Sequence, residues 1–346
     1  WGAALAAWAI LATAPLGASG ETEDARFLAG LRSRRLFQLA EAHCRRQLAR
    51  QDVTPAERGD LAVELIRTFA EHAVNTPLSQ REPLWQAAQE TAEKFQQAEP
   101  KNPRLPLVRT QQATTLLARG ELARQEAEVG GRREASLETA RQTIRGAIRL
   151  LRELEEELRR EIPLRRRARL EEGQLTADEL FALQNNIRLQ LARAYRNQAL
   201  SYPAGDVNRI AALTEALETL QRPLKELPAA DPLTWRVLMD QVVCLRLSGE
   251  YDRVRRLLTP LSSAEAPVEI RQQAAAEAAR MLLADNRPDQ AWQVLTQAGE
   301  GLADVDYARL ETLIALWSAA DEDPAKAWRE QAVELVGRIE ERHGPY

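Results

Sequence analysis

Apolar residues recur at helical spacing along most of the chain, and the pattern is clearest between residues 235 and 298. Two helix–turn–helix segments follow one another there. Val254 and Ala291 occupy equivalent places in the two returning helices, 37 residues apart, and Ala327 repeats the place 36 residues later. A period of this length is typical of stacked helix pairs, which bury their apolar faces against neighbouring pairs. We therefore predict an all-α chain of helical repeats.

A longer apolar seam runs through the middle of the chain, and the residues between its members are largely Arg and Glu. Ile162-Pro163 is expected to stop this helix, and the capping box Thr176–Glu179 to start the next one. The pattern predicts a long antiparallel helical hairpin with residues 159–173 at its tip. A pair of elongated repeat helices is the alternative, and the two differ in how far the tip projects. The seam consists of Leu137, Ala140, Ile144, Ala147, Leu151, Leu154 and Leu158.

The first 20 residues carry no charged side chain, and small residues lead to the acidic residues that begin at Glu21. The apolar run from Ala3 to Leu16 followed by small residues resembles a secretory signal peptide and its cleavage region. A retained membrane anchor and a buried first helix are the alternatives. We predict export to the periplasm or cell envelope.

Breaks rich in proline and glycine divide the chain into four predicted segments. Residues 1–20 form the signal peptide or anchor, and residues 21–106 the N-terminal helical repeats. Residues 107–204 form the long hairpin, and residues 205–346 the C-terminal repeats.

The segment Gly249-Glu250-Tyr251-Asp252-Arg253-Val254, followed by Leu258 and Leu261, is similar to a known repeat motif. It resembles the turn and returning helix of the tetratricopeptide repeat (TPR) family, whose turn has the pattern Gly-Asp-Tyr-Asp-x-Ala. Residues 286–298 are a second, looser match. The resemblance implies a right-handed superhelical α-solenoid of antiparallel helix pairs, whose concave face binds peptides or protein surfaces. It implies no chemistry.

The same resemblance places partner-binding residues on the first helix of each pair. Arg246 and Arg280 are the candidates for holding a partner's carboxylate with two hydrogen bonds each, and solvated arginines are the alternative. The predicted lining consists of Arg236, Met239, Val243, Arg246, Gln273, Ala276, Arg280 and Leu283.

The formal net charge is −4, so no overall field favours nucleic acid as a partner. One local cluster is strongly basic and could dock anionic lipid or an acidic protein, which makes peripheral membrane contact a candidate. Glutamates surround the cluster, and a solvated tip of mixed charge is the alternative. The basic cluster at the tip comprises Arg159, Arg160, Arg165, Arg166, Arg167 and Arg169.

The sequence contains no recognisable catalytic, cofactor-binding or metal-binding motif. The three histidines are far apart, the two cysteines are predicted to be unpaired and buried, and no phosphate-binding or nucleophile motif occurs. We therefore predict no enzyme, no cofactor and no metal.

The leading hypothesis is a non-enzymatic scaffold or adaptor of the bacterial cell envelope that binds a protein or peptide. One alternative is an assembly element in which residues 137–194 oligomerise as a coiled coil. The other is a regulatory N-terminal part of a larger protein.

Overall fold

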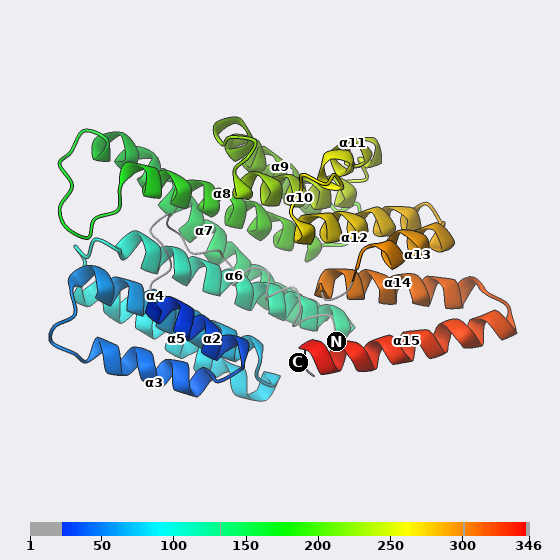
Figure 1. Cartoon of the computed structure of the whole chain (residues 1–346), viewed down its shortest axis with the longest axis horizontal. Helices are drawn as coiled ribbons and strands as arrows, with labels where there is room; N and C mark the ends of the chain where they lie inside the picture. Colours follow the sequence, from blue (N-terminus) through cyan, green and yellow to red (C-terminus); the bar gives the residue numbers. More distant parts are fainter. Residues whose placement is uncertain (1–22, 132, 300–301, 344–346) are drawn as a thin grey trace. The chain divides into compact units, whose positions relative to one another are not determined.

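The computed structural model describes residues 23–343 except 132, 300 and 301. Within these residues all regular secondary structure is helical, so the prediction of an all-α chain is confirmed. The described helices fall into two compact units that divide at residue 209 (Figure 1). Residues 1–20, predicted as a signal peptide or anchor, lie outside the described part. None of the described helices is long and apolar enough to cross a membrane.

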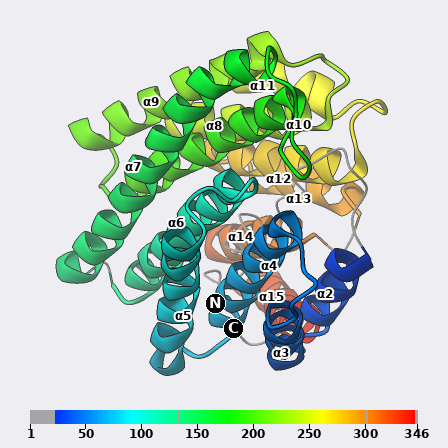
Figure 2. The same cartoon turned by 90° about the vertical axis from the view of Figure 1, so that its left-hand side faces the viewer.

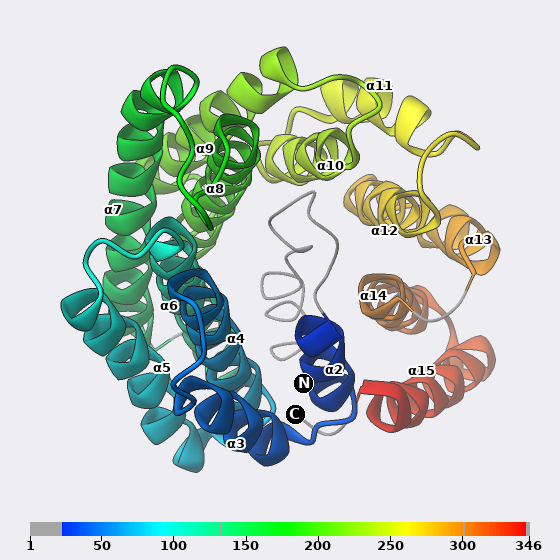
Figure 3. The same cartoon turned by 60° about the vertical axis from the view of Figure 1, so that its left-hand side comes forward.

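The N-terminal unit is a succession of antiparallel helices in which each helix packs on the next, and often on the next but one. In Figure 3, α4 and α6 lie side by side, and α5 contacts both of them. The helices are α2 (Glu23–Ser33), α3 (Phe37–Leu48), α4 (Pro55–Val74), α5 (Leu78–Ala98), α6 (Leu105–Val129), α7 (Glu134–Arg165) and α8 (Ala177–Leu200). This order of packing is repeat-like, as the sequence predicts.

Helix starts follow the local sequence. Thr54 caps α4 and Thr176 caps α8, each in a capping box closed by the glutamate three residues later, as predicted for Thr176. The predicted stop at Pro163 is wrong, because α7 continues to Arg165. A proline this close to a helix end removes one backbone hydrogen bond from a turn that is about to finish, so its cost is small there.

The long seam of α7 is fully covered within the chain. Its seven residues, from Leu137 to Leu158, are each at most 3% exposed, because α6 and α8 pack on it (Figure 2). At Gly120 of α6 an added Cβ would lie 2.7 Å from Cγ1 of Ile144, so only glycine allows this close approach of α6 to α7. The seam is therefore an intramolecular interface.

The last residue of the predicted tip lies against another helix of the same unit. Gly173, with φ of +78°, lies so close to the start of α4 that an added Cβ would be 2.8 Å from Cβ of Ala56. The segments predicted as N-terminal repeats and as a central hairpin form one compact unit, since α6 contacts α4 and α5 as well as α7.

The C-terminal unit repeats the same packing. The helix α12 contacts α10 and α14, and the shorter α11 and α13 pack on the helices that flank them (Figure 3). The helices are α9 (Val207–Glu226), which begins at the boundary, α10 (Pro232–Leu247), α11 (Tyr251–Leu261), α12 (Val268–Ala284), α13 (Pro288–Gln297), α14 (Ala303–Ala319) and α15 (Glu322–His343).

The apolar register of the returning helices holds, with one correction. Val254 and Ala291 are both buried, whereas Ala327 is exposed and does not continue the repeat. The third member is Trp328, 37 residues after Ala291, and its ring meets Trp292 edge-on at 6.0 Å between centroids. A large ring replaces the small residue at this place, and one residue of shift turns a helix by about 100°. The pattern of small residues therefore gave the wrong register in α15.

Candidate interaction surfaces

Arg246 of α10 and Arg280 of α12, predicted to hold a partner's carboxylate, hold carboxylates of this chain instead. Nε of Arg246 donates to Glu277 at 2.5 Å. Nη1 of Arg280 donates to the other oxygen of Glu277 at 2.7 Å. The guanidinium of Arg280 also reaches Asp304 at 2.7 Å and Glu311 at 3.0 Å on α14. The ion pairs form a ladder across three neighbouring first helices.

Burial makes this ladder electrostatically strong. The side chain of Glu277 is 2% exposed, and those of Arg246 and Arg280 are 20% and 14% exposed. Burial by itself would raise the pKa of Glu277, but attraction to Arg246 and Arg280 outweighs it and leaves that pKa below its usual value. Burial would likewise lower the pKa of Arg280, and its three carboxylate neighbours reverse the effect. Neither the predicted grip on a partner nor solvated arginines describes these groups.

The rest of the predicted lining is poorly exposed as well. Met239 is 5% exposed and belongs to the apolar core with Val242 and Leu245, so its assignment to a groove surface is corrected. Val243 packs against the same core, while Arg236 and Gln273 are half-buried. The first helices α10 and α12 thus offer little apolar surface where the resemblance expected it.

The neighbouring helix α14 does offer such surface. Tyr307, Ile314 and Trp317 are 39%, 47% and 41% exposed, and Leu310 between them is half-buried. With spacings of three, four and seven, these residues share one side of the helix, while Val305, Ala308 and Thr312 on the opposite side are buried. We call Tyr307, Leu310, Ile314 and Trp317 the α14 stripe.

The α14 stripe continues the predicted groove line into the next repeat. Adding the 37-residue period to Gln273 and Arg280 gives Leu310 and Trp317. The edge of the stripe is charged, because Glu311 lies on the same side and the guanidinium of Arg329 stands 5.7 Å from the ring centre of Trp317. The sequence contained this signal, in the apolar spacing of residues 307–317 and in the period.

The predicted basic tip divides into engaged and unengaged arginines. Arg159 and Arg160 both bind Glu156, and Arg165 binds Glu161 at 2.5 Å and Gln174 at 2.7 Å. The other three tip arginines are Arg166, Arg167 and Arg169. They are exposed, and in the described part of the chain their guanidinium groups make no hydrogen bond or ion pair.

An open cleft of about 900 Å³ lies beside the tip, between the loops that precede α4, α6 and α8. Its polar groups hold these loops together: Arg58 donates to Glu99 at 2.7 Å, and Asn102 donates to Glu99 at 2.6 Å and to the carbonyl of Pro55 at 2.7 Å. These contacts stabilise the loops, and none of them pairs a nucleophile with a general base.

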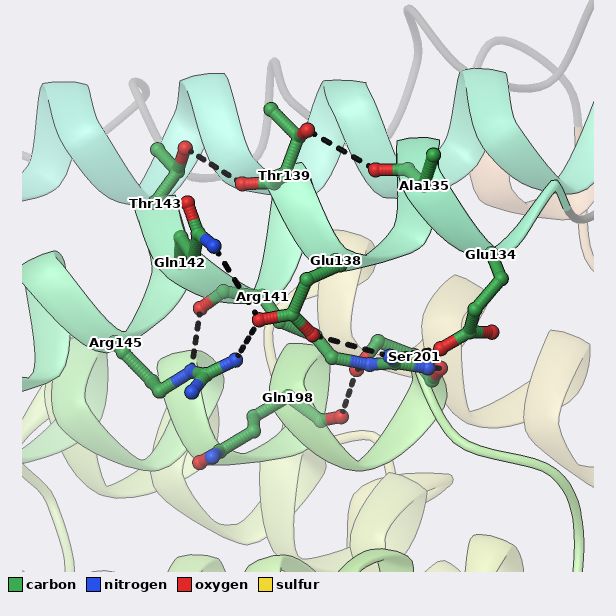
Figure 4. A network of polar contacts seen from close by, with 10 residues as sticks. All are labelled: Glu134, Ala135, Glu138, Thr139, Arg141, Gln142, Thr143, Arg145, Gln198 and Ser201. Atoms are coloured by element: carbon green, nitrogen blue, oxygen red, sulfur yellow. Dashed lines mark hydrogen bonds and ion pairs between the residues drawn. The ribbon is translucent and has the colours of Figure 1, made fainter.

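One of the buried arginines, Arg141, shows the same structural use of charge at the other end of this unit. Arg141 of α7 is 6% exposed and donates to the carbonyl of Ser201 at 2.8 Å, beyond the end of α8 (Figure 4). It also pairs with Glu134 at 2.5 Å, and its guanidinium lies 4.4 Å from the ring centre of Tyr202. These contacts fasten the start of α7 to the end of α8.

Reactive groups are scarce in what the structure describes. Cys44 and Cys244 are buried and form no disulfide, as predicted, and burial raises the pKa of the Cys44 thiol to about 12. A thiol with so high a pKa is a poor nucleophile at neutral pH. No group of three or more His, Cys, Asp or Glu side chains among the described residues is placed to hold a metal ion.

The fold and its surfaces define a class, an all-α protein of helical-repeat-like architecture. No model of a known protein family matches the chain, and a search of curated proteins finds no significant similarity.

Proposed function

We propose that the chain is a non-enzymatic protein–protein interaction scaffold or adaptor, and that the α14 stripe is the apolar centre of its binding surface. The observation that carries this proposal is the exposure of Tyr307, Ile314 and Trp317 on one face of a helix whose other face is buried. Single exposed apolar side chains are ordinary on protein surfaces, whereas a row of large ones with a charged edge is typical of interaction sites.

The chemistry of the stripe favours a partner with apolar anchors. Two aromatic rings and two branched side chains over three helical turns match an amphipathic helix, or an extended peptide with spaced apolar residues. Arg329 at the edge would favour a negative charge on the partner's flank, whereas Glu311 is already paired with Arg280.

We further propose that the helix pairs stack as a right-handed α-solenoid of the TPR type. The constant 37-residue spacing of Val254, Ala291 and Trp328, and the contacts of α12 with α10 and α14, support this arrangement. The proposed place of action is the bacterial periplasm or cell envelope, on the strength of the signal-like residues 1–20.

A selection from a displayed library of random peptides, with the whole chain as bait, tests the binding surface without knowledge of the natural partner. We expect selected peptides to carry apolar residues at helical or alternating spacing and to bind with micromolar affinity. The variant Tyr307→Ser/Ile314→Ser/Trp317→Ser should weaken their binding at least tenfold, since apolar anchors dominate such interfaces.

The matched control removes three exposed apolar side chains elsewhere, in Val207→Ser/Ile210→Ser/Val268→Ser, at positions that are 79%, 57% and 59% exposed. This control should bind the peptides as the unaltered chain does. Equal binding by all three proteins would refute the assignment of the stripe. Concentration-dependent dimers that only the stripe variant abolishes would show that the stripe binds a second copy, against an adaptor role.

A further inference from the structure

We propose that the tip between α7 and α8 docks on the surface of an anionic lipid bilayer. Three unengaged arginines stand there between two exposed leucines, Leu164 and Leu170, which are 66% and 45% exposed. Solvation of a charged loop does not account for exposed leucines on both sides of it. Arginines that meet lipid phosphates and leucines that enter the acyl boundary are the two components of interfacial binding.

The acidic residues near the tip face a different place. Glu171 and Glu172 line the cleft beside the tip, whereas none of the tip arginines lines it. Glu156 and Glu161 are engaged by Arg159, Arg160 and Arg165. Two of the glutamates near Arg166, Arg167 and Arg169 are thus paired with other arginines, and two more line the cleft. Segregation of this kind keeps a short basic surface on a chain whose net charge is −4.

Two features of the local structure hold the tip in place for docking. Gln174 accepts from Arg165 at 2.7 Å and donates to Glu171 at 3.0 Å, which braces the loop internally. Gly173 rests against Ala56 at the start of α4, which braces the loop against the rest of the unit. A braced loop presents its arginines and leucines at a smaller entropic cost than a free one.

A lipid surface explains these features better than an acidic protein segment does. An acidic segment would pair with the arginines and leave Leu164 and Leu170 in water, whereas a bilayer accepts both kinds of side chain. Each arginine near an anionic surface contributes about fivefold to partitioning, so three contribute on the order of 100-fold.

The test uses the whole chain with a polarity-sensitive dye on a cysteine introduced by Ala168→Cys. Cys44 and Cys244 are 0% and 1% exposed and should stay unlabelled. A dye at the tip reports on the tip alone, whatever the apolar residues 1–20 do in a membrane. Vesicles with one quarter phosphatidylglycerol in phosphatidylcholine should shift the emission to the blue, and pure phosphatidylcholine should not.

The variant Arg166→Glu/Arg167→Glu/Arg169→Glu, made in the labelled chain, should raise the lipid concentration for half-maximal shift by at least about 100-fold, because it removes three attractions and adds repulsion. The matched control Arg46→Glu/Arg133→Glu/Arg149→Glu makes the same change of net charge at exposed positions elsewhere in this unit and should leave it unchanged. The variant Leu164→Ser/Leu170→Ser should reduce the blue shift of the dye, while its arginines still attract the anionic vesicles. Thermal melts should show that all variants fold.

The absence of a shift with anionic vesicles would overturn the proposal. An equal loss in the charge variant and its control would also overturn it, because the effect would then be that of net charge. A shift caused by soluble polyglutamate but not by anionic vesicles would assign the tip to an acidic protein partner instead.

Discussion

Helices α7 and α14 carry the same kind of apolar spacing, and the structure uses them in opposite ways. The seam of α7 is at most 3% exposed from Leu137 to Leu158, because α6 and α8 cover it. The stripe of α14 is 39–47% exposed at Tyr307, Ile314 and Trp317, although α12, α13 and α15 pack on other faces of that helix. Apolar spacing therefore predicts a helix with an apolar face, and only the tertiary arrangement decides whether that face is buried in the core or exposed.

The comparison also bears on the coiled-coil alternative. A second copy would need the seam of α7, which this chain already buries. Leu164 is the large exposed apolar residue of α7 among those described, and it lies at the tip. Self-assembly through residues 137–194 has no uncovered apolar face to use in the described unit.

The largest expected effect comes from shortening a seam residue. Leu151→Ala should lower the free energy of unfolding by about 2–5 kcal/mol, because it leaves a cavity at a fully buried position. Leu164→Ala on the same helix, at a 66% exposed position, should change it by less than about 0.5 kcal/mol. Chemical denaturation measures both. Similar losses for the two variants would break the contrast between seam and surface.

The next effect concerns the part of the ladder that ties α12 to α10. Glu277→Ala should cost about 3 kcal/mol, since it removes the buried carboxylate between two arginines. Asp252→Ala removes a partner that is 85% exposed from an ion pair with Arg255, and should cost less than about 1 kcal/mol. If the two variants melted at one temperature, the buried carboxylate of Glu277 would not hold α12 against α10.

The acid dependence of stability should follow the same carboxylate. Because the pKa of Glu277 is below its usual value in the folded chain, its ionised form stabilises the fold above a pH of about 4.5. That contribution is lost as the pH falls through the lowered pKa. Glu277→Gln should therefore flatten the fall of melting temperature on the acid side. An unchanged acid profile would contradict the ionised state of Glu277.

The smallest expected effect on stability comes from a substitution in the α14 stripe. Ile314→Ser should change the free energy of unfolding by less than about 0.5 kcal/mol, because this side chain is 47% exposed. The binding of selected peptides should fall all the same. A loss of several kcal/mol in stability would show that Ile314 is part of the core. The apolar face of α14 would then be buried like that of α7, and the contrast between the two helices would fail.

The sequence predicts much of this architecture through local rules. The seam of α7 and the capping box at Thr176 are local patterns of side chains that the structure keeps. The prediction placed α15 in the wrong register because it traced the repeat by a small residue at this position. In α15 the position holds the large residue Trp328. Such a substitution changes the pattern without changing the packing position.

The surroundings of the candidate arginines were harder to predict, because the partners of a charged side chain depend on the tertiary fold. Nothing local to Arg246 indicates Glu277, which lies 31 residues later on another helix. A pattern that marks the first helices as binding surface therefore selected arginines that the fold uses internally. The α14 stripe could have been found by extending the 37-residue period once more.

The most direct test of the central claim is photo-crosslinking of a selected peptide to the whole chain with benzoylphenylalanine at position 314 or at position 268. Val268 is 59% exposed, so both probes are equally accessible, but only position 314 lies in the stripe. The account predicts a saturable crosslink from position 314 that excess unlabelled peptide abolishes, and none from position 268. Saturable crosslinks from position 268 alone, or from neither position despite peptide binding, would contradict it.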